Sequence, residues 1–120
     1  MTAGVGAIVM STARTSQVVA FYRSLGIPLV EEDHGDGIVH WACELGDVHF
    51  AVFEAAGSGH APGYHEPGST FCGFVVDDVR SAVELLRSSS TIVQEPIEMP
   101  WGLRAVVVDP DGRPVEVFER

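Results

Sequence analysis

The chain has 120 residues, 46% of them apolar, which is enough for one compact domain or for two small modules that share a core. Its formal net charge of −10 argues against nucleic-acid binding, because that binding depends on Lys and Arg side chains that neutralise phosphates. All seven basic residues are Arg, so Schiff-base chemistry on a lysine is excluded.

Hydropathy and cysteine use indicate the compartment. No stretch approaches the roughly 20 consecutive apolar residues that cross a bilayer, and residues 1–10 lack the basic start of a secretion signal. Cys43 and Cys72 lie in strand-like runs without a CxxC pair, which is typical of buried free thiols in a reducing compartment. These features predict a cytoplasmic protein without a membrane partner.

Two amphipathic helices are predicted at matching places in the two halves, over residues 15–26 and 78–89. In each, apolar side chains recur at i, i+3, i+4 and i+7, which is the spacing of one helix face. These stripes are Val18, Phe21, Tyr22 and Leu25 in the first helix and Val79, Ala82, Val83 and Leu86 in the second. The residues that can cap or end the helices are Thr15 or Ser16, Gly26, and Asp77 or Asp78.

Predicted strands surround each helix in the same order, one before it and three after it. In the first half they cover residues 5–10, 27–32, 38–45 and 48–54. In the second half they cover residues 70–76, 91–98, 103–108 and 114–119. Both halves end in the letters Val-Phe-Glu, at residues 52–54 and 117–119. An internal repeat of this kind predicts a fold built from duplicated units.

The repeat predicts an α+β fold in which two βαβββ modules, residues 1–54 and 70–120, form a single domain. Two such modules side by side would give a curved eight-stranded mixed sheet around a cleft, with the helices outside. That cleft is the natural ligand site. Residues 55–69, rich in Gly, Ser and Pro, form the linker. A linker of this length also allows a module to pair with a module of a second copy in a homodimer.

The last predicted strand follows a tight turn, Asp109-Pro110-Asp111-Gly112. Proline presets φ for a type I turn, and glycine can take the positive φ that closes a hairpin. Because side chains alternate along a strand, Glu116 and Phe118 share one face of it. A carboxylate beside an aromatic ring on one face indicates either a strand edge or a lined cavity.

Three motifs carry a resemblance to a known family. They are Phe21-Tyr22-Arg23-Ser24-Leu25-Gly26 after an apolar strand, Val76-Asp77-Asp78-Val79 before the second helix, and the Asp109–Gly112 turn followed by Glu116. Over nearly its whole length the chain resembles the vicinal oxygen chelate superfamily. This superfamily includes glyoxalase I, bleomycin-resistance proteins, fosfomycin-resistance enzymes and extradiol dioxygenases. The resemblance implies the fold, whereas the activity varies, since several chemistries and several non-enzymes share it.

The resemblance also implies where a metal would bind. In the family's enzymes, a divalent metal in the cleft is held from the first and last strands of each half. Glu116 is the implied ligand on the last strand, whereas Phe71 and Ala7 stand where histidines are usual. On the last strand of the first half, one register implies His49 and the other implies Ala51. This set contains fewer protein ligands than Zn, Ni, Mn or Fe usually have. No cofactor is therefore expected, and a bound divalent metal is the alternative.

The candidate residues are open to a binding interpretation and a structural one. Glu116 can anchor a ligand or act as a base, or it can pair with Arg104 on the neighbouring strand. His34 and His40 flank two strands and are interpreted as structural. Candidates for contacts with a bound molecule are Trp41, His49, Ala51, Phe53, Phe71, Trp101, Arg104 and Phe118. The linker residues interpreted as solvated loop, rather than as a lid, are His60, Tyr64 and His65.

These observations give one leading hypothesis and two alternatives. The leading one is a metal-free homodimer that sequesters an aromatic or cationic metabolite or antibiotic in an aromatic-lined cleft, as the resemblance to bleomycin-resistance proteins implies. The first alternative is a divalent-metal-dependent lyase, isomerase or dioxygenase that uses His49 and Glu116, with His60 or His65 as a further ligand. The second is metal-independent acid–base catalysis by Glu116.

Overall fold

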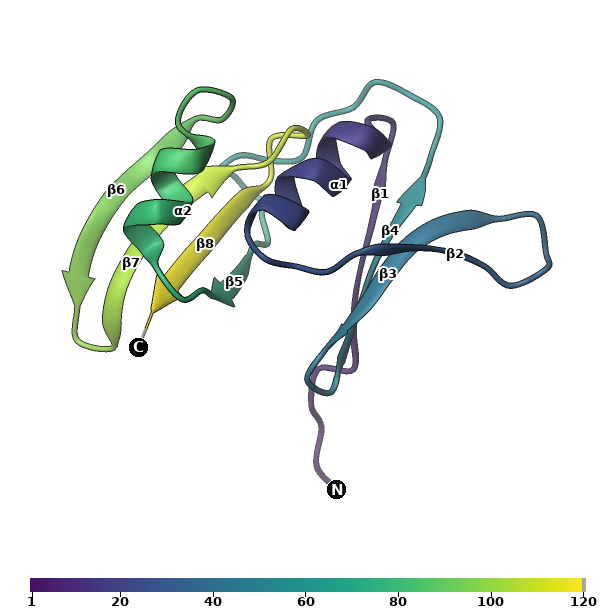
Figure 1. Ribbon diagram of the computed structural model, residues 1–120, viewed down its shortest axis with the longest axis horizontal. Coiled ribbons are helices and arrows are strands. Elements are labelled where there is room, and N and C mark those ends of the chain that lie inside the picture. The colour runs from purple at the N-terminus through teal and green to yellow at the C-terminus, as the bar shows by residue number, and fades with distance from the viewer. Residues whose placement is uncertain (120) are drawn as a thin grey trace. The chain divides into compact units, whose positions relative to one another are not determined.

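A computed structural model describes residues 1–119, and its elements follow the predicted order (Figure 1). The chain divides into two compact units, Met1–Ser58 and Gly59–Arg120, and the boundary falls inside the predicted linker. Each unit holds one βαβββ module. The α+β fold class is confirmed, and the eight strands form two four-stranded mixed sheets.

The first unit contains one helix and one sheet. Its elements are β1 (Ala7–Thr12), α1 (Thr15–Ser24), β2 (Val30–Asp33), β3 (Val39–Leu45) and β4 (Val48–Glu54). The strand order is β1-β4-β3-β2, with β1 parallel to β4 and the other pairs antiparallel. The parallel pair requires a crossover connection, and α1 provides it.

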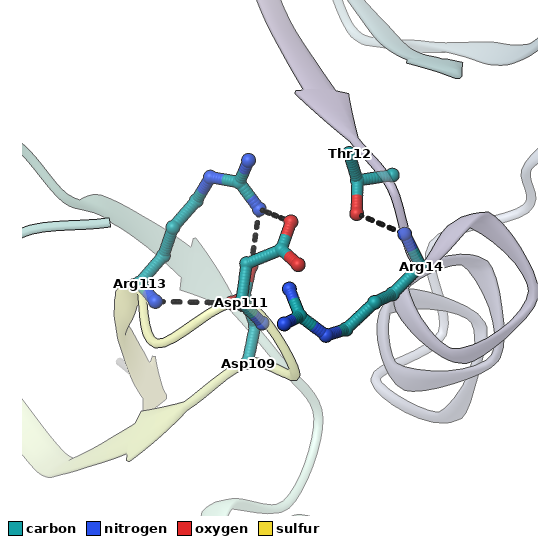
Figure 2. A network of polar contacts seen from close by, with 5 residues as sticks. All are labelled: Thr12, Arg14, Asp109, Asp111 and Arg113. Carbon is teal, nitrogen blue, oxygen red and sulfur yellow. Dashed lines mark hydrogen bonds and ion pairs between the residues drawn. The ribbon is translucent and has the colours of Figure 1, made fainter. Parts of the chain in front are cut away.

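Helix α1 covers one face of the first sheet. Its apolar stripe is buried, and the Tyr22 ring lies 5.3 Å from the ring of Phe50 on β4. The prediction that Thr15 or Ser16 caps this helix is wrong, because the N-cap is Arg14 and no side chain caps it. Instead, the Arg14 backbone N–H donates to the Thr12 hydroxyl at 2.9 Å, which fixes the turn between β1 and α1 (Figure 2).

The second unit repeats this plan. Its elements are β5 (Cys72–Val75), α2 (Val79–Leu86), β6 (Ile92–Met99), β7 (Gly102–Val108) and β8 (Pro114–Glu119). The strand order is β5-β8-β7-β6, with β5 parallel to β8. The predicted cap of α2 is confirmed, since the Asp78 carboxylate accepts from the backbone N–H of Ser81 at 3.0 Å. Neither helix within residues 1–119 has the length and apolar character that a membrane crossing requires.

The turn between β7 and β8 is organised by a buried carboxylate. Asp109 Oδ1 accepts from the backbone N–H groups of Asp111 and Arg113, at 2.9 and 3.0 Å. The Arg113 guanidinium donates to both carboxylates, at 2.9 Å each (Figure 2). Gly112 adopts the predicted positive φ, +91°. This network sets the position at which β8 begins, and so the face on which each β8 side chain lies.

Candidate functional site

One face of the second sheet carries the polar and aromatic residues that the sequence singled out. Along β8, Val115 and Val117 are buried, and α2 contacts β8 together with β6 and β7. Glu116 and Phe118 alternate with these valines, so they lie on the opposite face, which we call the open face. By strand register and alternation, this face also carries Phe71, Gly73, Val75, Ile97 and Arg104, together with Val106, which pairs with Glu116 and is fully buried.

An ion pair lies on the open face. Arg104 Nε donates to Glu116 Oε2 at 2.9 Å, and the two side chains are only 15% and 17% exposed. The register places Arg104 directly opposite Phe118, so it reaches Glu116 diagonally across β7 and β8. This hydrogen bond raises the pKa of Arg104, so the guanidinium stays charged. The pairing that the sequence suggested for Glu116 is therefore present.

Tyr64 joins this ion pair from the linker. Arg104 Nη2 donates to the Tyr64 hydroxyl oxygen at 3.0 Å, and the Tyr64 ring lies 5.4 Å from the Phe71 ring. The interpretation of Tyr64 as a solvated loop residue is wrong, because it is half-buried. Its linker neighbours His60 and His65 are exposed, as predicted. A linker rich in Gly and Pro gives no periodic signal, so the sequence could not show that Tyr64 packs on this sheet.

Apolar side chains on the same face are left uncovered. Phe71 is 40% exposed, and Val75 and Ile97 are more exposed still. Gly73 pairs with Glu116 across β5 and β8. A Cβ at Gly73 would lie 3.2 Å from Phe118 Cε1 and 3.5 Å from Glu116 Oε1, so glycine leaves room for both side chains. The face can therefore offer an aromatic ring and a charged donor to a small molecule.

The residues around Glu116 do not fit a divalent metal. Its carboxylate already accepts from a guanidinium, whose positive charge repels a cation. Phe71, which stands at a position where the resemblance implies a histidine, offers no donor atom. Among the residues that the structure describes, Glu116 belongs to no group of three His, Cys, Asp or Glu side chains that could hold an ion.

The first sheet carries His49, Ala51 and Phe53 on the face opposite α1, because Phe50 between them points to the helix. The parallel register places Ala7 beside His49, and Val9 beside Ala51. His49 is half exposed, and its Nδ1 contacts the Glu44 carboxylate across β3 and β4. His49 and Ala51 thus lie on one face two residues apart, as the sequence predicted.

The two tryptophans lie apart from these groups. Trp41 pairs with Val52, so it lies on the α1 side of the first sheet and not with His49, Ala51 and Phe53. Trp101 is exposed at the turn between β6 and β7. His40 is buried as a structural histidine should be, and its ring stacks on Phe53 with centroids 4.5 Å apart. Phe53 is therefore partly covered by an imidazole.

Comparison with known families agrees with this architecture. The sequence profile of the Glyoxalase/Bleomycin resistance protein/Dioxygenase superfamily matches residues 4–117. The chain belongs to this superfamily. A comparison with curated proteins finds no match.

Several solved structures of the superfamily's fold are similar to this chain. A hypothetical protein from S. aureus, SA1046, is 18% identical with a TM-score of 0.70, and the match covers 100% of this chain and 99% of that one. TnmS3, an antibiotic binding protein from Streptomyces sp. CB03234, is 20% identical with a TM-score of 0.66, covering 98% and 96%. A glyoxalase I mutant from Zea mays is 19% identical with a TM-score of 0.75, covering 97% of this chain and 45% of that one. At these identities the likeness concerns the fold.

Proposed function

We propose that this protein binds and sequesters a small aromatic molecule on the open face of the second sheet, without a metal at that face. The observation that carries the proposal is the Arg104–Glu116 ion pair, joined by Tyr64 and bordered by the exposed ring of Phe71. A ligand site typically combines apolar walls with a few placed polar groups, and this face has both.

The charges on the face favour an aromatic ligand over a cationic one. Arg104 neutralises Glu116, so the carboxylate is not free to anchor a cation. The guanidinium can instead stack on a ring or donate to a carbonyl, phenolate or carboxylate of the ligand. The exposed Phe71 ring offers a second stacking surface. Because the similar structure TnmS3 is described as an antibiotic binding protein, aromatic antibiotics belong in the first screen.

The metal-dependent and acid–base alternatives have less support. A lyase, isomerase or dioxygenase that uses His49 and Glu116 needs both side chains as metal ligands, yet each is paired with a residue of its own sheet. For Glu116 to act as a base, a substrate would have to displace Arg104 from its carboxylate.

The test is chemical-shift mapping of ¹⁵N-labelled protein with a library of neutral and anionic aromatic compounds that includes aromatic antibiotics. We expect saturable shifts at Phe71, Gly73 and Val75, and Phe71→Ala should weaken binding roughly tenfold, as the loss of one buried aromatic contact predicts. The matched control is Leu85→Ala, which removes an exposed apolar side chain from α2. No saturable binding, or equal effects of both variants, would overturn the proposal.

We also propose that the protein works in the cytoplasm as a homodimer of single-domain chains. Free thiols at Cys43 and Cys72 suit a reducing compartment. Exposed apolar residues outside the open face, such as Val9 on β1 and Val39 on β3, are surface that a second copy can cover. Sedimentation equilibrium across micromolar concentrations tests the assembly, and a monomer throughout contradicts it.

A further inference from the structure

Three potential metal ligands meet on the β2–β3 hairpin, away from the open face. Antiparallel pairing places Glu32 opposite His40, and His34 follows Glu32 by two residues, so the three side chains share a face. Glu32 Oε2 lies 3.2 Å from His40 Nε2 and 3.4 Å from His34 Nε2. Each residue offers one ligand atom, and these atoms all lie within 4.8 Å of one another. We call Glu32, His34 and His40 the hairpin cluster.

We propose that the hairpin cluster is a binding site for Zn²⁺. Bonds of about 2.0–2.2 Å from zinc to nitrogen or oxygen place two ligands at a tetrahedral angle about 3.3–3.5 Å apart. The separations of 3.2 and 3.4 Å from Glu32 Oε2 to the two imidazoles match that spacing. Two imidazoles and one carboxylate suit zinc better than Ca²⁺ or Mg²⁺, which prefer oxygen ligands alone.

The cluster is partly held in place before any ion arrives. His40 is only 4% exposed, and its ring stacks on Phe53 with an angle of 8° between the planes. Its Nε2 contacts Glu32, whereas its buried Nδ1 has no hydrogen-bond partner within residues 1–119. The stacked ring thus presents Nε2, and not Nδ1, to an ion at the cluster.

The remaining two ligands can adjust to the ion. Glu32 is partly exposed, and the His34 side chain is 66% exposed, so small rotations can bring its Nε2 to bonding distance. A simple ion pair needs one imidazole for one carboxylate, whereas here two imidazoles converge on the same oxygen. Three protein ligands leave a fourth position for water or for an anionic group.

This site differs from the one that the family resemblance implies. The implied metal ligands lie on the first and last strands of each half, whereas the hairpin cluster belongs to β2 and β3 and their connection. It also shares no residue with the open face of the second sheet. Zinc binding at the hairpin and aromatic binding at the open face can therefore succeed or fail independently.

The test is isothermal titration of EDTA-treated protein with ZnCl₂, combined with ¹H–¹⁵N spectra of the imidazole nitrogens. We expect one Zn²⁺ per chain, with coordination shifts at the Nε2 atoms of His34 and His40. His34→Ala and Glu32→Gln should each weaken binding roughly tenfold or more, because each removes one of three ligands. Both change exposed or partly exposed side chains, so the fold should survive, as circular dichroism can verify.

Two matched controls remove a histidine elsewhere. His60→Ala changes an exposed linker histidine, and His49→Ala changes the imidazole paired with Glu44. Both should bind Zn²⁺ like the wild type. No saturable binding by the wild type, undiminished binding by His34→Ala, or loss of binding in His49→Ala would each overturn the assignment. His40→Ala is not a suitable probe, because removing a buried, stacked ring disturbs the core as well.

Discussion

Replacing Asp109 by Ala should be among the most damaging single changes in the second unit. The Asp109 side chain is fully buried, and its two oxygens accept two backbone N–H groups and one guanidinium N–H of the β7–β8 turn. Removing one partner of a buried ion pair costs about 3–5 kcal/mol. Because a turn lies near water, which can satisfy part of what is lost, we expect the free energy of unfolding to fall by about 3–4 kcal/mol.

Asp109→Asn separates the two parts of this effect. The Asn side-chain oxygen can still accept from the backbone N–H groups of Asp111 and Arg113, but the charge facing the Arg113 guanidinium is gone. We expect this variant to lose roughly half as much as Asp109→Ala, since it keeps the hydrogen bonds that shape the turn. Arg113→Met with each variant completes a double-mutant cycle, in which the coupling should be about 1–3 kcal/mol.

The assay is urea unfolding at neutral pH, followed by circular dichroism, with the m-value checked for each variant. Unchanged m-values would mean that the differences in midpoint report stability alone. A loss below about 1 kcal/mol in Asp109→Ala would refute the argument, since surface carboxylates typically have effects of that size. Equal losses in Asp109→Ala and Asp109→Asn would show that the charge, and not the pair of backbone hydrogen bonds, dominates.

Three further predictions concern local features. Gly112→Ala should lower the free energy of unfolding by about 1–2 kcal/mol in urea melts, because φ is +91°, whereas Gly6→Ala should have little effect. Hydrogen bonds from Ser81 lower the pKa of Asp78 in the folded protein below its ordinary value of 3.8. The stabilisation that this carboxylate gives α2 is therefore complete above pH 3.8 and is lost as the pH falls through the lower, folded-state pKa. The urea midpoint of Asp78→Ala should therefore lie below that of the wild type at neutral pH and converge with it in acid; a constant gap contradicts this. Burial raises the pKa of Cys72 above 9.0 despite Arg113 nearby, so its alkylation by iodoacetamide at neutral pH should be slower than that of glutathione.

Most of the fold could be predicted because its signals are local and repeated. The apolar stripes of the two helices, the Gly26 stop, the Asp78 cap and the Asp-Pro-Asp-Gly turn each act within a few residues, so sequence spacing alone reveals them. The exception is the start of α1. There the Thr12 hydroxyl, three residues before the helix, accepts from the Arg14 N–H, and no side chain caps the first turn of the helix.

The site was less predictable because it depends on contacts between distant residues. Strand alternation correctly placed Glu116 and Phe118 on one face, and adjacency of strands suggested Arg104 as a partner. Tyr64 and Arg104 are 40 residues apart in the sequence, and Tyr64 lies in an irregular loop, so no sequence pattern predicts their contact. The hairpin cluster was missed because the register that aligns Glu32 with His40 depends on the turn between them.

The linker is held at both of its ends, which changes its effective length. The Ala55 N–H donates to the Thr12 carbonyl in the first unit, and the Ala61 N–H donates to the Asp111 carbonyl in the second. Only residues 56–60 lie between these two anchors, so the connection can span about 20 Å when fully extended. A connection this short gives each module an effective concentration in the millimolar range for the other module of the same chain. Exchange of modules between two copies must compete with that proximity. Deleting residues from 56–60, so that the connection can no longer span the distance, is therefore the direct way to favour exchange, whereas an insertion disfavours it.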